Sequence, residues 1–98
     1  MLTNEKILAA FEEYLAADKV CEVVLTSRGY TVMEWNEPRR EWYNVQLCDT
    51  PEALRDALLA TYRDYLTDQY TSDEQDDPTP AQQEEIRQKC EKMMELCK

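Results

Sequence analysis

The only glycine of this 98-residue chain, Gly29, constrains the fold more than any other single residue. It separates the runs VCEVVLTS and YTVMEW, which are rich in the β-branched and aromatic residues typical of strands. Because glycine adopts positive φ without steric cost, it is the residue expected at a tight hairpin turn. The two runs therefore predict a β-hairpin that turns next to Gly29.

A third strand is predicted over the run EWYNVQLC, which follows the turn-like sequence NEPRR. Asn36 and Pro38 suit a turn, and proline cannot continue a central ladder. Strict alternation in this run places two sets of side chains on opposite faces: Tyr43, Val45 and Leu47 against Trp42, Asn44 and Gln46. Three consecutive strands with short connections predict an antiparallel meander. The pattern leaves open which face of the sheet carries Trp42.

Helices are predicted before and after the three strands along the chain. A first helix is capped at Asn4 and ends near Asp18, with apolar residues at helical spacing: Ile7, Leu8, Phe11, Tyr14 and Leu15. Thr-Pro pairs at 50–51 and 79–80 each predict a helix start, and the earlier of these two helices runs to about Tyr70. The predicted class is α+β, a three-stranded antiparallel meander covered by helices in the order α-β-β-β-α-α.

The chain divides into three segments. Residues 1–70 predict one α-β-β-β-α domain, and residues 71–80, TSDEQDDPTP, predict a mobile acidic linker because they contain no large apolar residue. Residues 81–98 predict a helix with a narrow apolar seam: Ile86, Cys90, Met93 and Cys97. About two heptads are too short to stand alone. We therefore expect this helix to pack on its own domain or on a second chain, which would make a homodimer.

Charge limits the possible partners and the compartment. The 21 acidic and 11 basic residues give a formal charge of −10, which disfavours direct binding to nucleic acid and to anionic membranes. The chain start carries charges where a signal peptide would be apolar, and no segment approaches the ~20 apolar residues that span a bilayer. We expect a cytoplasmic protein.

No residue pattern predicts catalysis, a cofactor or a metal. The four cysteines form no CxxC pair and the chain has no histidine, which argues against a zinc site and leaves a cysteine nucleophile without its usual base. The acidic segment lacks the central glycine and the register of a calcium loop. The carboxylate pairs at 12–13 and 84–85 fall on predicted exposed helix faces. We expect no enzyme activity, no cofactor and no catalytic residue.

Two segments are candidate binding sites. An aromatic and basic tip at the second hairpin would suit contact with a protein partner: Arg39, Arg40, Trp42 and Tyr43. The simpler interpretation is that Trp42 covers a sheet face while the arginines are solvated. A cluster of acids in the linker would suit imitation of nucleic-acid phosphates: Asp73, Glu74, Asp76 and Asp77. A solvated linker is the simpler interpretation there.

The segment GYTVMEWNEPRREWYNVQLCDTPEALRDALLATYRDYL, residues 29–66, resembles small acidic accessory proteins of unknown function carried by conjugative elements of gut Firmicutes. The resemblance implies cytoplasmic cargo of a mobile element and supplies no catalytic residue. From the residues themselves we expect a non-enzymatic protein-interaction or accessory protein. The alternative is a nucleic-acid-mimicking inhibitor of a DNA-binding or RNA-binding enzyme.

Overall fold

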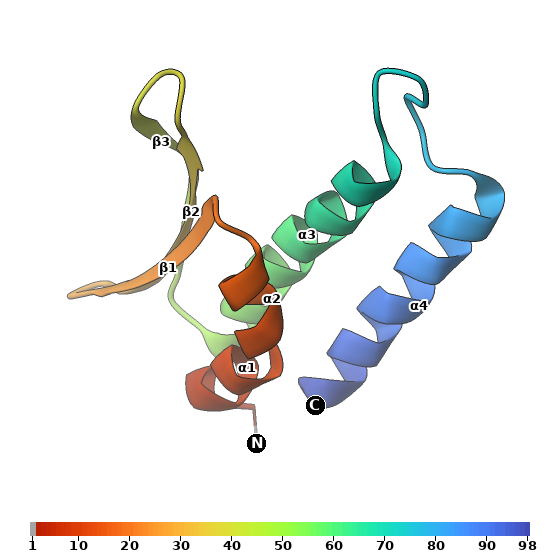
Figure 1. Ribbon diagram of the computed structural model, residues 1–98. Helices are drawn as coiled ribbons and strands as arrows, with labels where there is room; N and C mark the ends of the chain where they lie inside the picture. The colour runs from red at the N-terminus through yellow and green to blue at the C-terminus, as the bar shows by residue number, and fades with distance from the viewer. Residues whose placement is uncertain (1) are drawn as a thin grey trace.

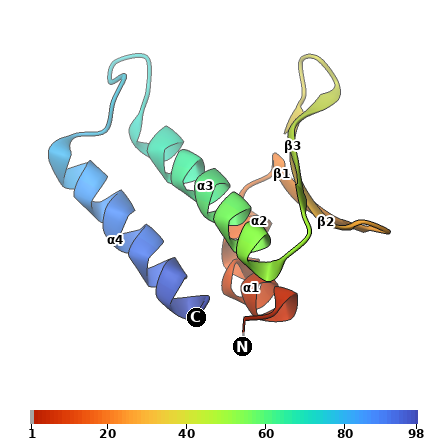
Figure 2. The ribbon, with the colours of Figure 1, turned by 180° about the vertical axis from the view of Figure 1, so that it is seen from behind.

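The computed structural model describes residues 2–98 and confirms the α+β class and the element order. The elements are α1 (Asn4–Ala10), α2 (Glu12–Ala17), β1 (Cys21–Thr26), β2 (Gly29–Asn36), β3 (Glu41–Cys48), α3 (Pro51–Tyr70) and α4 (Pro80–Leu96). The strands form an antiparallel sheet in the order β1-β2-β3. Figures 1 and 2 show α1, α2 and α3 beside the sheet, with α4 on the far side of α3. Among residues 2–98, no helix is long and apolar enough to cross a membrane.

The first helical segment begins one residue earlier than predicted. Thr3, not Asn4, is the N-cap, because its backbone is extended and its hydroxyl accepts a hydrogen bond of 3.2 Å from the N–H of Lys6. The helix is interrupted at Phe11, which separates α1 from α2, and Asp18 ends it as predicted. Ile7, Phe11 and Tyr14 are buried in the core.

The β1–β2 hairpin turns at the predicted place. Thr26 pairs with Gly29 across a two-residue turn, and the φ of Gly29 is +126°. A Cβ at this position would lie 3.1 Å from the carbonyl oxygen of Cys48 at the end of β3. Gly29 thus meets two demands, positive φ and close approach of a neighbouring backbone.

A β-bulge interrupts the alternation of β3 at Asn44, whose φ is +52°. The pairing between β2 and β3 shifts between Val32 and Glu34, so that Asn44 and Val45 stand opposite the single residue Met33. Such a bulge inserts one residue and changes which face the following side chains occupy. Asparagine tolerates the left-handed backbone better than most residues.

The alternation predicted for β3 is therefore wrong. Trp42 pairs with Trp35 and Leu47 pairs with Thr31, and these two β2 residues are four apart and share a face. Consequently three residues of β3 point to the same side of the sheet: Trp42, Val45 and Leu47. Tyr43, which pairs with Glu34, points to the other side.

The main core lies between the sheet and the helices. Its fully buried side chains include Ile7, Phe11, Val32, Leu54, Leu58 and Cys97. The Thr-Pro starts of α3 and α4 are confirmed, since each threonine hydroxyl accepts a hydrogen bond from a backbone N–H three residues later. At α4 the side chain of Gln82 also accepts from the N–H of Thr79, which completes a capping box.

Helix α4 packs on its own chain. Ile86 and Cys90 form a second buried cluster with Leu66 of α3, while Cys97 lies in the main core and Met93 is half-buried against it. The predicted seam is thus occupied within one chain, so little of it faces solvent. Of the two alternatives for this helix, the structure has the one in which it packs on the domain.

The loop between α3 and α4 makes defined contacts. The side-chain amide of Gln75 donates hydrogen bonds to the carbonyl of Tyr70 at 2.7 Å and to the side chain of Gln82 at 2.8 Å. The Tyr70 hydroxyl donates to Glu85 at 2.5 Å. These bonds join the end of α3 to the start of α4 and orient the acidic segment between them.

Candidate interaction surface

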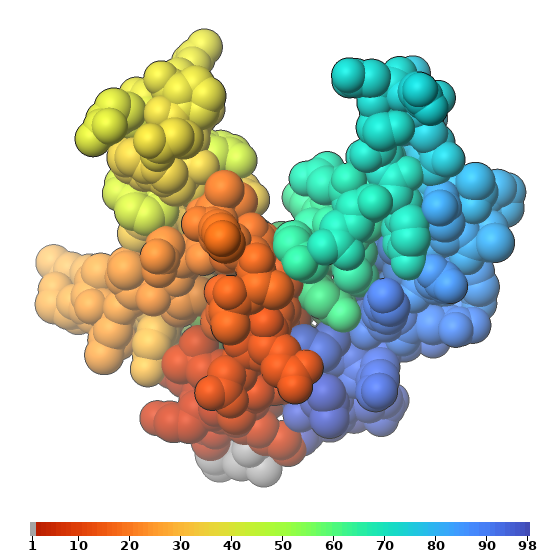
Figure 3. All heavy atoms as spheres, in the orientation of Figure 1, coloured from red at the N-terminus to blue at the C-terminus, as the bar shows by residue number. Residues whose placement is uncertain are grey.

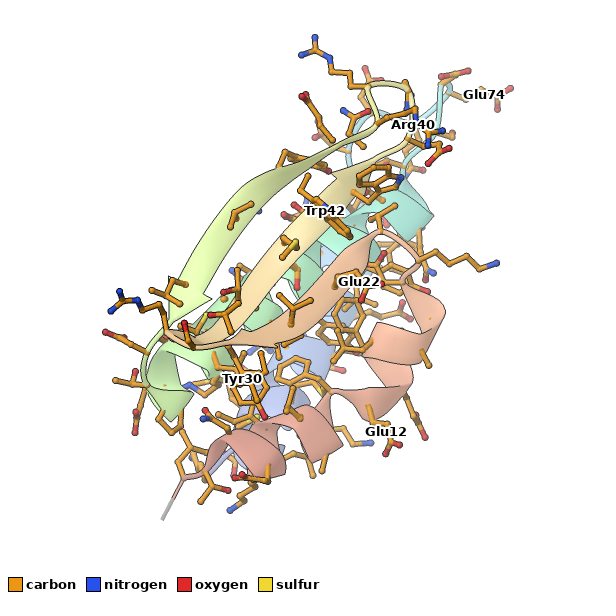
Figure 4. All side chains as sticks on the ribbon, turned by 90° about the vertical axis from the view of Figure 1, so that its left-hand side faces the viewer. Glu12, Glu22, Tyr30, Arg40, Trp42 and Glu74 are labelled. Carbon is orange, nitrogen blue, oxygen red and sulfur yellow. The ribbon has the colours of Figure 1, made fainter. Side chains whose placement is uncertain are left out.

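One face of the sheet has no helix of residues 2–98 against it, and we call it the outer face. Register assigns nine side chains to it: Glu22, Val24 and Thr26 from β1, Thr31, Met33 and Trp35 from β2, and Trp42, Val45 and Leu47 from β3. Figure 4 views this side, with α3 and α4 behind the strands, α1 and α2 beside them, and Trp42 and Glu22 labelled. The outer face is the structural feature most open to a partner.

The outer face is unusually apolar for a surface. Six of its nine side chains are apolar and only Glu22 is charged, whereas 33% of the whole chain is charged. An antiparallel sheet with one solvated face ordinarily carries polar residues on that face. Here the uncovered face has the composition expected of a sheet face that packs against another layer of protein.

Four of the six apolar side chains of the outer face are exposed, Val24, Trp42, Val45 and Leu47, while Met33 and Trp35 are partly buried. Trp42 is 45% exposed, Leu47 55% and Val45 58%. Val24 pairs with Thr31, which pairs with Leu47, so one row crosses all three strands, with the polar Thr31, 7% exposed, at its centre. Single exposed apolar residues are common, but a contiguous patch marks an interaction site.

Two tryptophans form one end of the outer face. The rings of Trp35 and Trp42 meet edge to face, with centroids 4.9 Å apart. The indole N–H of Trp35 donates to the carboxylate of Glu37 at 2.5 Å, which orients that ring. Lys19 and Glu22 line a shallow hollow beside the two rings. Trp42, half-exposed and backed by a second ring, has the form of a hot-spot residue.

The structure separates the four residues of the predicted tip. Arg39 and Arg40 lie in the exposed turn, where the guanidinium of Arg39 is 3.8 Å from Glu41. Trp42 lies on the outer face and Tyr43 on the helix side of the sheet. Val45 and Leu47 join Trp42 instead, and sequence reasoning missed this grouping. The signal available for it was the asparagine in the middle of a strand, since Asn44 suits the positive φ of a bulge.

On the helix side, Tyr43 borders an acidic cleft between the sheet and the second half of α3. The other lining residues are Glu34, Asn44, Asp64, Thr67 and Asp68. Figure 3 shows the hollow between the β2–β3 hairpin, in yellow, and the end of α3, in green to teal. Partial burial and then the nearby carboxylates, Glu34 foremost, raise the pKa of Tyr43. The cleft and the outer face therefore differ in chemistry.

The net charge is confined to the helices and loops outside the sheet segment. Residues 19–48 contain four basic residues, Lys19, Arg28, Arg39 and Arg40, and four acidic ones, Glu22, Glu34, Glu37 and Glu41. The formal charge of −10 thus falls on the rest of the chain. The predicted acidic segment belongs to that part, and all four of its acids are exposed: Asp73, Glu74, Asp76 and Asp77. None of the ion pairs formed within residues 2–98 involves them.

A buried polar cluster joins the end of α2 to β1 and α3. The Tyr14 hydroxyl donates to Asp18 at 2.7 Å, and Asp18 also accepts the backbone N–H of Val20 at 3.2 Å. The thiol of Cys21 lies 3.8 Å from the hydroxyl of Thr61. Burial raises the pKa of both Tyr14 and Cys21, so both stay protonated at neutral pH. The thiol of Cys21, buried and protonated, is a structural group and not a nucleophile.

The predicted carboxylate pairs lie at the surface, and Glu12 and Glu13 border an open groove that α4 also lines. Glu12, Glu13, Glu84 and Glu85 are exposed, and an ion pair and hydrogen bonds with Arg87 lower the pKa of Glu84. Within residues 2–98, no three Cys, Asp or Glu side chains are grouped so as to hold a metal ion. A comparison with models of protein families, with curated proteins and with solved structures finds no match to this chain.

Proposed function

We propose that this protein is a small, acidic, non-enzymatic protein that acts by binding a protein partner through its outer face. One observation carries the proposal: the sheet face that no helix covers is apolar, contiguous and nearly free of charge. Exposing such a face to water costs free energy that contact with a partner recovers. Trp42, at one end of that face, is its main contact residue.

Neighbouring aromatic residues on opposite faces provide a matched test. Trp42→Ala removes the largest exposed side chain of the outer face, whereas Tyr43→Ala removes a side chain of equal exposure, 45%, on the helix side. Proteins captured from a cytoplasmic extract by the immobilised chain are identified by mass spectrometry. We expect Trp42→Ala to lower their recovery at least tenfold and Tyr43→Ala to leave it unchanged. Equal recovery with both variants would contradict the proposal, provided that circular dichroism shows both folded.

The process served by this binding stays a prediction. The resemblance over residues 29–66 favours an accessory role in the cytoplasm for a protein carried by a mobile element. Partners identified by capture would test this directly. Components of a conjugation or replication apparatus would support it, and unrelated housekeeping proteins would not.

A second function, inhibition of a nucleic-acid-binding enzyme by phosphate mimicry, is favoured by the distribution of charge. The four acids of residues 73–77 are exposed and make none of the ion pairs formed within residues 2–98. A mimic would bind its partner with affinity that falls steeply with salt, whereas outer-face binding would change little.

Two charge-matched variants separate these functions. One converts the four acids of residues 73–77 to amides, and the control converts four exposed acids elsewhere: Glu5, Glu12, Glu13 and Glu52. Mimicry predicts that only the first variant loses its partner. Equal loss from both would indicate a general effect of net charge, and no loss from either would exclude mimicry by this segment.

A further inference from the structure

The distribution of charge favours a second copy of this chain as the partner of the outer face. Two molecules of charge −10 repel each other wherever α1, α2, α3 or the acidic loop of one meets those of the other, because residues 1–18 and 49–79 carry the whole net charge. Helix α4 is neutral overall, but its apolar seam is already buried within its own chain. The sheet segment, residues 19–48, has no net charge. On the outer face itself only Glu22 is charged. A second copy therefore meets little electrostatic resistance there.

Face-to-face packing also separates the acidic layers of the two molecules. Packed sheets lie ~10 Å apart, and helices lie about another 10 Å behind each sheet. The two helical layers would then be roughly 30 Å apart, several times the Debye length of about 8 Å at physiological ionic strength. Repulsion between the helical layers is consequently screened in this arrangement.

The size of the outer face suits a modest homodimer. Strands of eight residues, three abreast, form a face of roughly 26 by 14 Å from standard strand spacings. Two such faces amount to roughly 700 Å² of flat area in total, which places the contact at the low end of interface sizes, among weak and transient interfaces. An apolar patch with a single charge is also complementary to itself, as a two-fold interface requires.

We infer that two copies of this protein pack outer face to outer face, forming a homodimer with sheets inside and helices outside. The inference rests on the proposed function, since it names the partner of the same surface. It differs from dimerisation through the last helix, because Ile86, Cys90 and Cys97 are already buried within one chain. An interface this small is typical of weak association, so we expect the dimer to form in the micromolar concentration range or above.

The test uses two exposed leucines on opposite faces of the sheet. Leu47, 55% exposed, lies on the outer face, and Leu25, 69% exposed, lies on the helix side near the tip of the first hairpin. Sedimentation velocity is measured on the full chain between 1 and 500 µM, about three decades that bracket a micromolar constant. We expect the wild-type chain to approach twice 11.6 kDa as concentration rises.

Leu47→Lys is expected to raise the dissociation constant of the dimer at least 30-fold, and Val45→Lys should do the same. Leu25→Lys should leave the dissociation constant unchanged. These positions are exposed, so the monomer keeps its fold, which circular dichroism checks. Added salt should leave the dimer unchanged or strengthen it, because salt screens the repulsion between acidic copies.

A wild-type chain that is monomeric at every concentration would overturn the homodimer, as would a Leu47→Lys variant that dimerises normally. A different result would overturn the proposed function. If the chain is monomeric but Trp42→Ala still abolishes capture of another protein, the outer face is an interaction surface for a different partner and only the homodimer is wrong.

Discussion

Tyr14 and the buried cysteines link the stability of this protein to alkaline pH. Burial raises the pKa of Tyr14 above its usual value of 10.0 and the pKa values of Cys21, Cys48 and Cys97 above 9.0. The unfolded chain then releases these protons at lower pH than the folded chain does. The stabilising contribution is therefore complete below pH 9 and is lost as pH rises above it.

Urea unfolding between pH 8 and 11 measures this loss. Each group adds up to ~1.4 kcal/mol per pH unit to the decline in the free energy of unfolding, once its unfolded form is ionised. Tyr14→Phe should lower stability at neutral pH by about 1–3 kcal/mol, because Asp18 loses a hydrogen-bond donor. The same variant should make the decline above pH 10 shallower. An unchanged slope would show that Tyr14 ionises alike in both states.

Gly29 is predicted to resist substitution by any residue with a side chain. Gly29→Ala places a Cβ 3.1 Å from the carbonyl oxygen of Cys48 on a backbone with φ of +126°. We expect a loss of about 1–3 kcal/mol in the free energy of unfolding. Ser27→Ala, in the exposed turn two residues earlier, is the control and should stay within ~0.5 kcal/mol of wild type. Similar values for both variants would contradict this explanation.

At the scale of the elements, the bulge at Asn44 decides which side chains form the outer face. Asn44→Val favours extended backbone and opposes the φ of +52°, whereas Asn44→Gly permits it. Both variants lose the hydrogen bond of 2.9 Å to Glu34. We therefore expect Asn44→Val to be less stable than Asn44→Gly by ~1–2 kcal/mol, measured by urea unfolding. A more stable valine variant would mean that the strand prefers regular alternation.

The same elements show what the sequence could predict. The starts of α3 and α4 were predictable because a threonine cap acts on an N–H only three residues away, and proline suits the next position. The face of Trp42 was not, since one bulged residue reverses the side on which all preceding residues of β3 lie. The grouping of Trp42 with Val45 and Leu47 depends on that single residue, so a period-two pattern assigned it wrongly.

At the scale of the whole molecule, composition alone gave the charge but not its distribution. The net charge of −10 argued against nucleic acid and anionic membranes as partners. Only the three-dimensional arrangement shows that the outer face carries one charged residue, while the net charge lies on α1 to α3 and on the loop after α3. Likewise the spacing of the α4 seam predicted a buried stripe, and its partner within the chain became clear from the packing against Leu66.

Ile86 distinguishes folding contacts from association contacts. It is 6% exposed and packs with Leu66 and Cys90 between α3 and α4. Ile86→Ala should lower the free energy of unfolding by ~2–4 kcal/mol, because it leaves a cavity in this cluster. Since the seam is occupied within one chain, the dissociation constant of the proposed dimer should change less than threefold, measured by sedimentation at concentrations where the variant is folded.

Leu47→Lys should give the opposite pair of results, a weakened dimer and nearly unchanged monomer stability. If Ile86→Ala instead abolished dimerisation while the monomer stayed folded, α4 would be the interface and the outer face would need another partner.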